Sequence, residues 1–522
     1  MKHLLPILLL TLVAPTQAQD HASHEALGTV HFITTCAPTV QPEFNRAVAL
    51  MHSFQFARAI QSFNTILTQD PTCSMANWGI ALSNWGNPFG ANQKAQTQLD
   101  AGLKATEAAR AQHPKSPREH DYIEAASLLY TNAATIPQHT RMVAYEKAMA
   151  TLSAAYPEDT EAAIFYALSL ASAADPADKT YADQLKAGAI LDKLFAQYPD
   201  HPGLAHYIIH TYDVPALADR AVNAAQRYGA IAPDTAHALH MPSHTFTRVG
   251  NWQASIDTNI LSAASARKLH QPADELHADD YLVYAYLQTG QNKAALAVVQ
   301  SAAEAFTHFD PKMTIGGAAS PSAAYFAHAA IPARYALERA DWPAAAKLEV
   351  LSTAFAYTDA ITYFARGLGA AHTGDIEAAK SAIACLAEIH DKLVAAKEMY
   401  WALQVEIQHQ EVAAQLAFTQ GDKAGAITTM REAATLEDKT EKNAVTPGPL
   451  APARELLAEL LLANNQPAEA QKEFEATLTK EPNRLRSLTG ATKAAEAAGN
   501  KAAAQAHQSQ LEKITAKSDH ST

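Results

Sequence analysis

Small residues, glycines and prolines recur along this chain at fixed spacings, and these spacings constrain the fold more than any other feature. A glycine stands five positions before a small residue at Gly250, Gly290, Gly374 and Gly421. A small residue lets two helices approach closely, a glycine permits the turn between them, and a proline ends the second helix. The spacings therefore predict a repeated helix hairpin. A small residue, a small or apolar residue four positions on and a proline twelve positions on occur together at Ala59/Phe63/Pro71, Ala187/Leu191/Pro199, Ala221/Ala225/Pro233 and Ala470/Phe474/Pro482.

The segments between these markers have helical periodicity. They are rich in alanine, place apolar residues at i, i+3, i+4 and i+7, and are separated by Gly-Asp, Gly-Asn, Asp-Pro or Glu-Pro turns, whereas strand signals are scarce. Pro233 follows Pro199 by 34 residues. A chain of 522 residues, 48% of them hydrophobic, can bury a large core. We therefore predict an all-α fold.

In these residues the chain resembles the tetratricopeptide repeat (TPR) family, whose unit is two antiparallel helices over about 34 residues. The resemblance extends from about residue 40 to 510, with longer insertions near 85–120, 172–182 and 435–450. It implies an α-solenoid whose concave groove binds a protein or peptide partner. The chain is also similar to exported bacterial TPR proteins of unsettled function that share stretches like ALHMPSH, residues 238–244 here.

The amino-terminal residues predict export. A short basic start precedes the apolar run Leu4–Val13 and a small-x-small cleavage site at 16–18, as in a secretory signal peptide. No later stretch approaches the roughly 20 apolar residues needed to span a bilayer. We therefore expect a periplasmic or secreted protein without a membrane span. The predicted divisions are a signal peptide at 1–18, a leader segment at 19–40, the solenoid at 41–510 and a polar tail at 511–522.

The net charge limits the partners that we expect, and the cysteines bear on the compartment. A formal net charge of −13 has the wrong sign for binding a nucleic-acid backbone, so nucleic acid is not expected as a partner. In an oxidising compartment Cys36 and Cys73, which flank one helix-turn unit, either pair or stay reduced, and the sequence leaves both open. Cys385 lies in a helical apolar run, where a buried thiol is expected.

The chain has 23 histidines, and histidine is the commonest metal ligand. The repeat register indicates which of them face the groove. In the family that this chain resembles, the first helix of each hairpin lines the groove, and its inward positions are counted back from the turn residue. Counted from Ala216, Gly250 and Gly290, these positions fall on three successive sets: His206, His210 and Asp213; His237, His240, His244 and Arg248; His277, Asp280 and Tyr284.

Helical geometry independently places the histidines of each set on one helix face. Neighbouring helices pack about 8–10 Å apart, so these faces can meet in the groove. Imidazoles with a carboxylate suit Zn²⁺, Cu²⁺ or Fe²⁺, whereas Ca²⁺ and Mg²⁺ require mostly oxygen ligands. Pro242 either kinks the helix between His240 and His244 or starts a new one. We predict a transition-metal groove with the ligands His206, His210, His237, His240, His244, His277 and Asp213.

Both catalytic and non-catalytic roles fit such a groove. Three protein ligands leave a metal position for water, and a nearby carboxylate, arginine and tyrosine could complete an active site. Asp280, Arg248 and Tyr284 are the candidate catalytic residues, with Asp213 a second candidate base. A site that carries or senses metal needs only the ligands. The alternative is a peptide- or protein-binding scaffold without metal, whose histidine-lined groove changes charge between about pH 5 and 8.

Three weaker signals remain. Cleavage after Ala18 would leave His21 third from a free amine, a Cu²⁺-binding arrangement. His52 could face the groove, but a partly exposed surface position is favoured. Arg334 and Glu338, spaced i,i+4, predict an exposed ion pair rather than an anion site. No HExxH, Walker, dinucleotide, nucleophile-elbow or CxxC motif is present.

Overall fold

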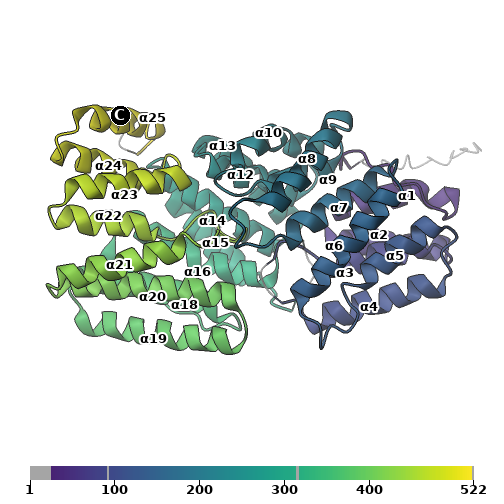
Figure 1. Ribbon diagram of the computed structural model, residues 1–522, viewed down its shortest axis with the longest axis horizontal. Helices are drawn as coiled ribbons and strands as arrows, with labels where there is room; N and C mark the ends of the chain where they lie inside the picture. Colours follow the sequence, from purple (N-terminus) through teal and green to yellow (C-terminus); the bar gives the residue numbers. More distant parts are fainter. Residues whose placement is uncertain (1–24, 91–92, 313–316, 520–522) are drawn as a thin grey trace, which may run out of the picture.

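A computed structural model describes residues 25–90, 93–312 and 317–519, and over these residues the protein is helical without a β-strand (Figure 1). Helices follow one another as antiparallel hairpins that stack side by side, which makes the fold a TPR-type α-solenoid. None of the helices in the described ranges is both long and apolar enough to cross a membrane. The predicted signal peptide, its cleavage site and His21 lie outside the described residues.

The first part of the stack contains four hairpins, drawn purple to blue in Figure 1. A 3₁₀ turn at Pro38–Val40 leads into them. The helices are α1 (Gln41–His52), α2 (Phe56–Gln69), α3 (Ser74–Trp85), α4 (Gln96–Ala111), α5 (Pro117–Ser127), α6 (Gln138–Ala155), α7 (Thr160–Ala173) and α8 (Ala182–Gln197).

The middle part contains the three hairpins on which the histidine register falls. Their first helices are α9, the broken pair α11 and α12, and α14. Pro242 is the first residue of α12, so it starts a new helix, one of the two alternatives that the sequence left open. The helices are α9 (Pro202–Thr211), α10 (Val222–Ile231), α11 (Ala236–His240), α12 (Pro242–Arg248), α13 (Trp252–Lys268), α14 (Pro272–Gln288) and α15 (Asn292–Thr307), with a 3₁₀ turn at Ala218–Ala221 before α10.

The last part, green to yellow in Figure 1, completes the stack. A long loop, 438–452, separates two of its hairpins where the sequence places an insertion. The helices are α16 (Pro321–Leu337), α17 (Trp342–Ala345), α18 (Ala356–Thr373), α19 (Ile376–Ala395), α20 (Met399–Thr419), α21 (Lys423–Glu437), α22 (Ala453–Ala463), α23 (Pro467–Lys480), α24 (Leu485–Ala497) and α25 (Lys501–Ile514).

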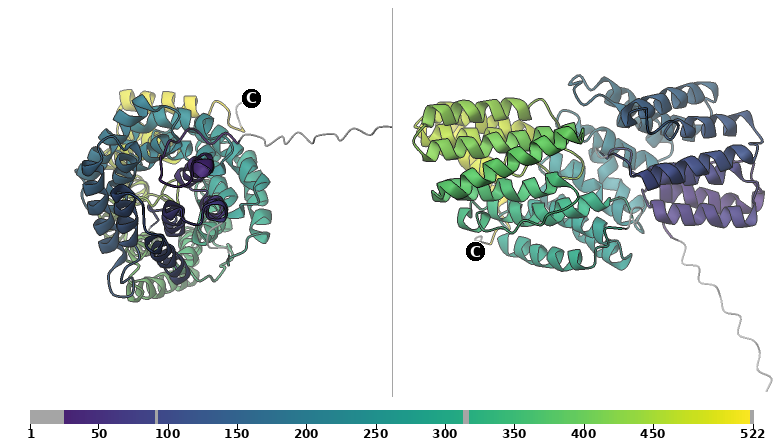
Figure 2. Two further views of the ribbon diagram at one scale, coloured as in Figure 1. Left: turned by 90° about the vertical axis from the view of Figure 1, so that its right-hand side faces the viewer. Right: turned by 90° about the horizontal axis from the view of Figure 1, so that it is seen from below.

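The stack winds around on itself, and the end-on view in Figure 2 shows the helices arranged in a ring. As a result α24 packs against α14, although about 200 residues separate them. The Trp252 indole donates a hydrogen bond to the Asn483 carbonyl oxygen at 2.8 Å, and the Asn483 amide donates to the Gly250 carbonyl oxygen at 3.1 Å. The last hairpins thus close onto the middle hairpins that carry the histidines.

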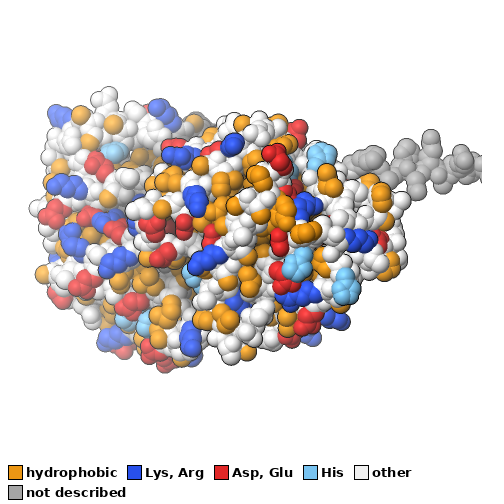
Figure 3. All heavy atoms as spheres, turned by 45° about the vertical axis from the view of Figure 1, so that its right-hand side comes forward, with side chains coloured by type: hydrophobic (Ala, Val, Ile, Leu, Met, Phe, Trp, Pro, Cys, Tyr) orange, Lys and Arg blue, Asp and Glu red, His pale blue; other side chains and the backbone are white. Residues whose placement is uncertain are grey.

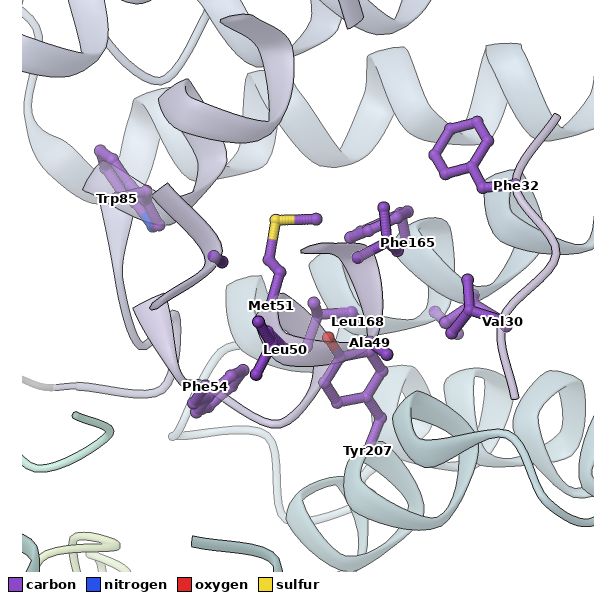
Figure 4. Packing of buried hydrophobic residues seen from close by; sticks show 14 of the residues in the cluster. Val30, Phe32, Ala49, Leu50, Met51, Phe54, Trp85, Phe165, Leu168 and Tyr207 are labelled. Carbon is purple, nitrogen blue, oxygen red and sulfur yellow. The ribbon is translucent and has the colours of Figure 1, made fainter. Parts of the chain in front are cut away.

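Residues 25–40, the described part of the predicted leader segment, contribute to the hydrophobic core. Val30 and Phe32 are buried, and Figure 4 shows them facing the same cluster as Phe165 and Tyr207. Cys36 and Cys73 form a disulfide that ties this segment to the start of α3. Cys385 is the free thiol of the described chain and is half-buried.

The outer surface carries charges of both signs. Figure 3 shows Lys and Arg interspersed with Asp and Glu over the visible face, without a continuous basic region. Many of these charges form exposed pairs such as Arg110 with Glu124. Pairs of this kind stabilise a fold only weakly.

The predicted turn glycines have the backbone conformation that the hairpin requires. Gly250 and Gly374 have φ values of +66° and +79°, in the left-handed region where residues with a Cβ are strained. In both turns the next residue caps the second helix: the Asn251 side chain accepts from the Ala254 amide, and the Asp375 side chain accepts from the Ala378 amide. The Gly-Asn and Gly-Asp pairs therefore end one helix and begin the next.

Gly250 and Gly374 form a matched pair for testing how the stack closes. A Cβ at Gly374 would meet nothing within 4 Å, so Gly374→Ala should cost only the left-handed strain, about 1–2 kcal/mol. A Cβ at Gly250 would collide with the Pro482 carbonyl oxygen as well. We expect Gly250→Ala to lower the melting temperature considerably more than Gly374→Ala, as measured by circular dichroism. Equal losses would show that the Gly250–Pro482 contact does not hold the last hairpins.

Candidate metal centre

Three neighbouring first helices bring six histidines together in the interior. His206 and His210 come from α9, His237 and His240 from α11, His244 from α12 and His277 from α14, and all six side chains are buried. Each helix presents these residues on one face, as the 3–4 residue spacings require. The imidazoles form two groups of three, which we call triad A (His206, His210, His237) and triad B (His240, His244, His277). Within each triad, one ligand atom per residue lies within 4.8 Å of the others.

Triad A contains a close contact between two ring nitrogens. Nε2 of His206 lies 3.0 Å from Nε2 of His237. The opposite nitrogen of His206, Nδ1, lies 2.6 Å from the His52 carbonyl oxygen. A carbonyl oxygen only accepts hydrogen bonds, so Nδ1 carries the proton and Nε2 presents a lone pair to His237. The third member, His210, has a buried Nε2 with no hydrogen-bond partner among the described residues.

Triad B contains the same contact with both tautomers fixed. Nε2 of His240 lies 3.0 Å from Nε2 of His244. Nδ1 of His240 faces the Asn259 Oδ1 at 2.8 Å, and the Asn259 amide donates to the Ser255 carbonyl, which fixes the amide orientation. Nδ1 of His244 faces an Asp213 carboxylate oxygen at 3.0 Å. Both Nδ1 atoms therefore donate, and the neutral rings direct two lone pairs at each other.

Facing lone pairs need a positive group between them. A proton is a poor occupant, because burial lowers the pKa of both His240 and His244 below the usual value of histidine. Two imidazole nitrogens that bind one Zn²⁺ at about 2.0–2.1 Å in a tetrahedral site lie about 3.3 Å apart, a few tenths of an ångström more than the observed contact. The third member, His277, adds a buried Nδ1 without a hydrogen-bond partner in the described structure. Triad B thus has the donor set of a transition-metal site.

Asp213 lies behind His244 rather than among the ring nitrogens. Its carboxylate also accepts from Arg248 Nε at 2.8 Å and from Lys442 Nζ at 3.2 Å. Burial alone would raise the pKa of Asp213, but Lys442, Arg248 and His244 hold it well below its usual value. Asp213 was predicted as a ligand, and the structure places its carboxylate behind the His244 ring, where it accepts from Nδ1 and orients the imidazole.

The two remaining candidate catalytic residues have partners away from the triads. Asp280 accepts a hydrogen bond from Arg334 Nε at 2.7 Å, with both side chains fully buried. The Tyr284 hydroxyl accepts from Arg484 at 3.0 Å. Arg248 is occupied by Asp213, as described above. The geometry therefore supports the imidazoles as the chemical groups of this site more than it supports these three residues.

The predicted Arg334–Glu338 surface pair is wrong. Arg334 is fully buried and pairs with Asp280, because α14 of the preceding hairpin and the loop 438–452 cover this helix face. Glu338 pairs instead with Arg484 at 2.7 Å.

The prediction of a partly exposed His52 is also wrong. The ring is fully buried between α7 and α9, with Nε2 2.9 Å from Glu161 and Nδ1 2.9 Å from the Tyr207 hydroxyl. His201 binds the other oxygen of Glu161 at 2.9 Å. Through its carbonyl oxygen, His52 also fixes the tautomer of His206. This second cluster therefore positions triad A.

A cavity of about 300 Å³ opens onto both triads. His210 and His237 of triad A and His244 and His277 of triad B line it. The rest of its wall is largely apolar and aromatic, a composition typical of small-molecule sites. These lining residues include Phe56, Phe89, Met241, Phe355, Tyr357 and Trp401, together with Lys94, whose pKa burial lowers to about 7.

Sequence reasoning missed three residues that support the triads. Asn259 lies on the second helix α13 and orients His240, while Lys442 comes from the loop 438–452 and pairs with Asp213. The Tyr281 hydroxyl lies 3.3 Å from His244 Nδ1 and donates to the carbonyl oxygen of Thr446 in the same loop. Only Tyr281 carried a usable signal, since it lies one helical turn after His277.

The chain matches no protein-family model and no curated protein. Among solved structures it is similar to a human IFIT1 dimer with m7Gppp-AAAA, at 10% identity and a TM-score of 0.36 over 85% of this chain and 90% of that chain. It is also similar to the P58(IPK) TPR domain, at 13% identity and a TM-score of 0.23 over 89% of this chain and 99% of that chain. TM-scores this low support no functional conclusion, and the fold assignment rests on the helix hairpins themselves.

The buried imidazoles predict acid sensitivity of the metal-free protein. Burial lowers the pKa of His206 and of His277 to about 3, against 6.5 in an unfolded chain. Between these values the unfolded chain binds protons that the folded chain does not, so the free energy of unfolding falls as the pH falls below about 6.5. Each such histidine contributes on the order of 1.4 kcal/mol per pH unit.

We therefore expect the melting temperature of metal-free His206→Gln/His277→Gln protein to depend less steeply on pH between 6.5 and 4 than that of the wild type. Calorimetry at several pH values measures both slopes. Equal slopes would contradict the depressed pKa values.

Proposed function

We propose that this protein binds transition-metal ions in the interior groove formed by α9, α11, α12 and α14. The observation that carries the proposal is the 3.0 Å contact between the Nε2 atoms of His240 and His244, whose Nδ1 atoms both donate elsewhere. Neutral imidazole is a ligand for Zn²⁺, Cu²⁺ and Fe²⁺. The ligands come from three hairpins, so an ion would also tie the repeats together.

The surroundings of the site support access by a small molecule. Three protein ligands leave an open position on a metal ion, and the cavity of about 300 Å³ adjoins the imidazoles. This arrangement suits a catalytic or ligand-binding metal better than a closed structural site. Catalysis would then depend on a metal-bound water or substrate, because Asp280 and Tyr284 are held by Arg334 and Arg484.

Export to the periplasm or the cell exterior is part of the proposal. The Cys36–Cys73 disulfide supports it, because disulfides persist in oxidising compartments. A protein or peptide partner on the concave surface of the solenoid is compatible with metal binding. The alternative, a peptide-binding scaffold without metal, would leave the ring nitrogens of triad B unsatisfied.

Metal analysis distinguishes the metal-binding function from the peptide-binding scaffold without metal. Protein purified without an affinity tag should contain at least one Zn, Cu or Fe ion per chain by inductively coupled plasma mass spectrometry. In the His240→Ala/His244→Ala variant the content should fall by at least one ion per chain, because both lone pairs are removed, while the helical circular dichroism signal is kept. Wild-type protein that neither contains nor takes up these metals would favour the scaffold.

Asp213 offers a test of the supporting contacts. Asp213→Asn weakens the acceptor that fixes the tautomer of His244, and loss of such a contact typically lowers metal affinity about 10–100-fold. Competition with a chromophoric chelator measures the affinity. Asp192→Asn is the matched control, because Asp192 lies on α8 outside both triads and, in the described structure, accepts a hydrogen bond from the Tyr212 hydroxyl at 2.8 Å. An unchanged affinity in Asp213→Asn would remove Asp213 from the site.

A further inference from the structure

We propose that the six imidazoles hold a pair of metal ions, one in triad A and one in triad B, with both ions facing the same cavity. The inference rests on the proposed function and adds the number and arrangement of the ions. Its basis is that one local pattern occurs twice, side by side, on three consecutive hairpins.

The repeated pattern has two parts. Each triad contains one Nε2–Nε2 contact of 3.0 Å, His206 with His237 in triad A and His240 with His244 in triad B. Each triad also contains a third histidine with a buried ring nitrogen that lacks a hydrogen-bond partner in the described chain, Nε2 of His210 and Nδ1 of His277. A packed core satisfies its buried polar atoms, so an unpartnered imidazole nitrogen in each of two adjacent histidine triads points to a missing partner in each of them.

A single ion cannot satisfy both triads. A transition metal of this class takes about four ligands in a tetrahedral site. An ion placed in triad B would leave Nε2 of His210 without a partner, and His206 and His237 with only the contact between their ring nitrogens. Ring centroids lie 4.8 to 6.2 Å apart within triad A and 4.4 to 6.1 Å apart within triad B. Between the triads, His210–His244 and His237–His240 are 5.9 Å and 6.2 Å apart, so the two groups adjoin, and the division between them rests on their ligand-atom distances.

The charge of the site indicates what completes each coordination shell. All six ligands are neutral, and the nearest carboxylate described, Asp213, is already compensated by Arg248 and Lys442. Two divalent ions would therefore bring an uncompensated buried charge. The shared cavity can supply a small oxygen anion such as hydroxide to both ions, because each triad contributes two of its histidines to the cavity wall. Two ions bridged in this way can bind both the attacking and the leaving group of one substrate.

The number of metal ions bound per chain tests whether the two triads hold a pair of ions. The protein used is full-length, untagged and metal-free, in a His21→Ala background that removes the predicted amino-terminal copper motif. Equilibrium dialysis against Zn²⁺ should give two ions per chain. His206→Ala/His210→Ala and His240→Ala/His277→Ala should each give one ion. His328→Ala, whose ring stacks on Phe306 away from both triads, is the control and should still give two.

Electron paramagnetic resonance of the Cu²⁺-loaded protein gives a measurement that does not depend on the variants. A bridging oxygen couples the spins of two Cu²⁺ ions, so the integrated signal of the wild type should fall well below its copper content. Each triad variant that folds should show the full signal of one isolated ion. One ion per chain in the wild type overturns the pair and leaves the proposed function standing, and two ions with full signal overturn the bridge between them. No bound ion overturns both.

Discussion

Hydrogen bonds from the Nδ1 atoms of His206, His240 and His244 set the direction of the whole imidazole array. Each bond ends on an oxygen atom that cannot donate back: the His52 carbonyl, the Asn259 amide oxygen and the Asp213 carboxylate. The unprotonated Nε2 atoms are thereby turned toward one another in a buried region. The chemistry of the site thus follows from acceptors that lie outside it.

Stacking of equivalent hairpins makes this convergence possible. A repeat of constant length places the same helix face of successive units side by side. Stacking of neighbouring hairpins is therefore enough to bring together the histidines at equivalent positions of α9, α11, α12 and α14. The break at Pro242 separates α11 from α12 within one hairpin and keeps His240 and His244 within 3.0 Å of each other. Residues 86–90, 317–323 and 443–445 then enclose the cavity beside these histidines.

Local signals in the sequence were sufficient for the repeats and for the histidine register. Gly250 and Gly374 predicted turns because only a residue without a Cβ tolerates their backbone conformation, and the small residues five positions later marked the close packing of the hairpins. The burial of His52 and the pairing of Arg334 with Asp280 could not be predicted, because they depend on which helices of other hairpins pack against these positions. Asn259 and Lys442 were missed because nothing in their local sequence marks them. An amide on a second helix and a lysine in a loop have no periodicity that points to His244 or His240.

The loop 438–452 contacts both the histidine region and the first part of the stack. Lys442 reaches from this loop to the Asp213 carboxylate, and Glu441 beside it contacts Lys179 and Tyr181 on the far side of the ring. An ion held by His244 would favour the position of Asp213 that also receives Lys442. Occupancy of the centre and docking of the loop would then be thermodynamically linked, and each would change the affinity of the other by the same factor. The affinity of a molecule that binds the docked loop would then depend on whether the histidine centre holds an ion.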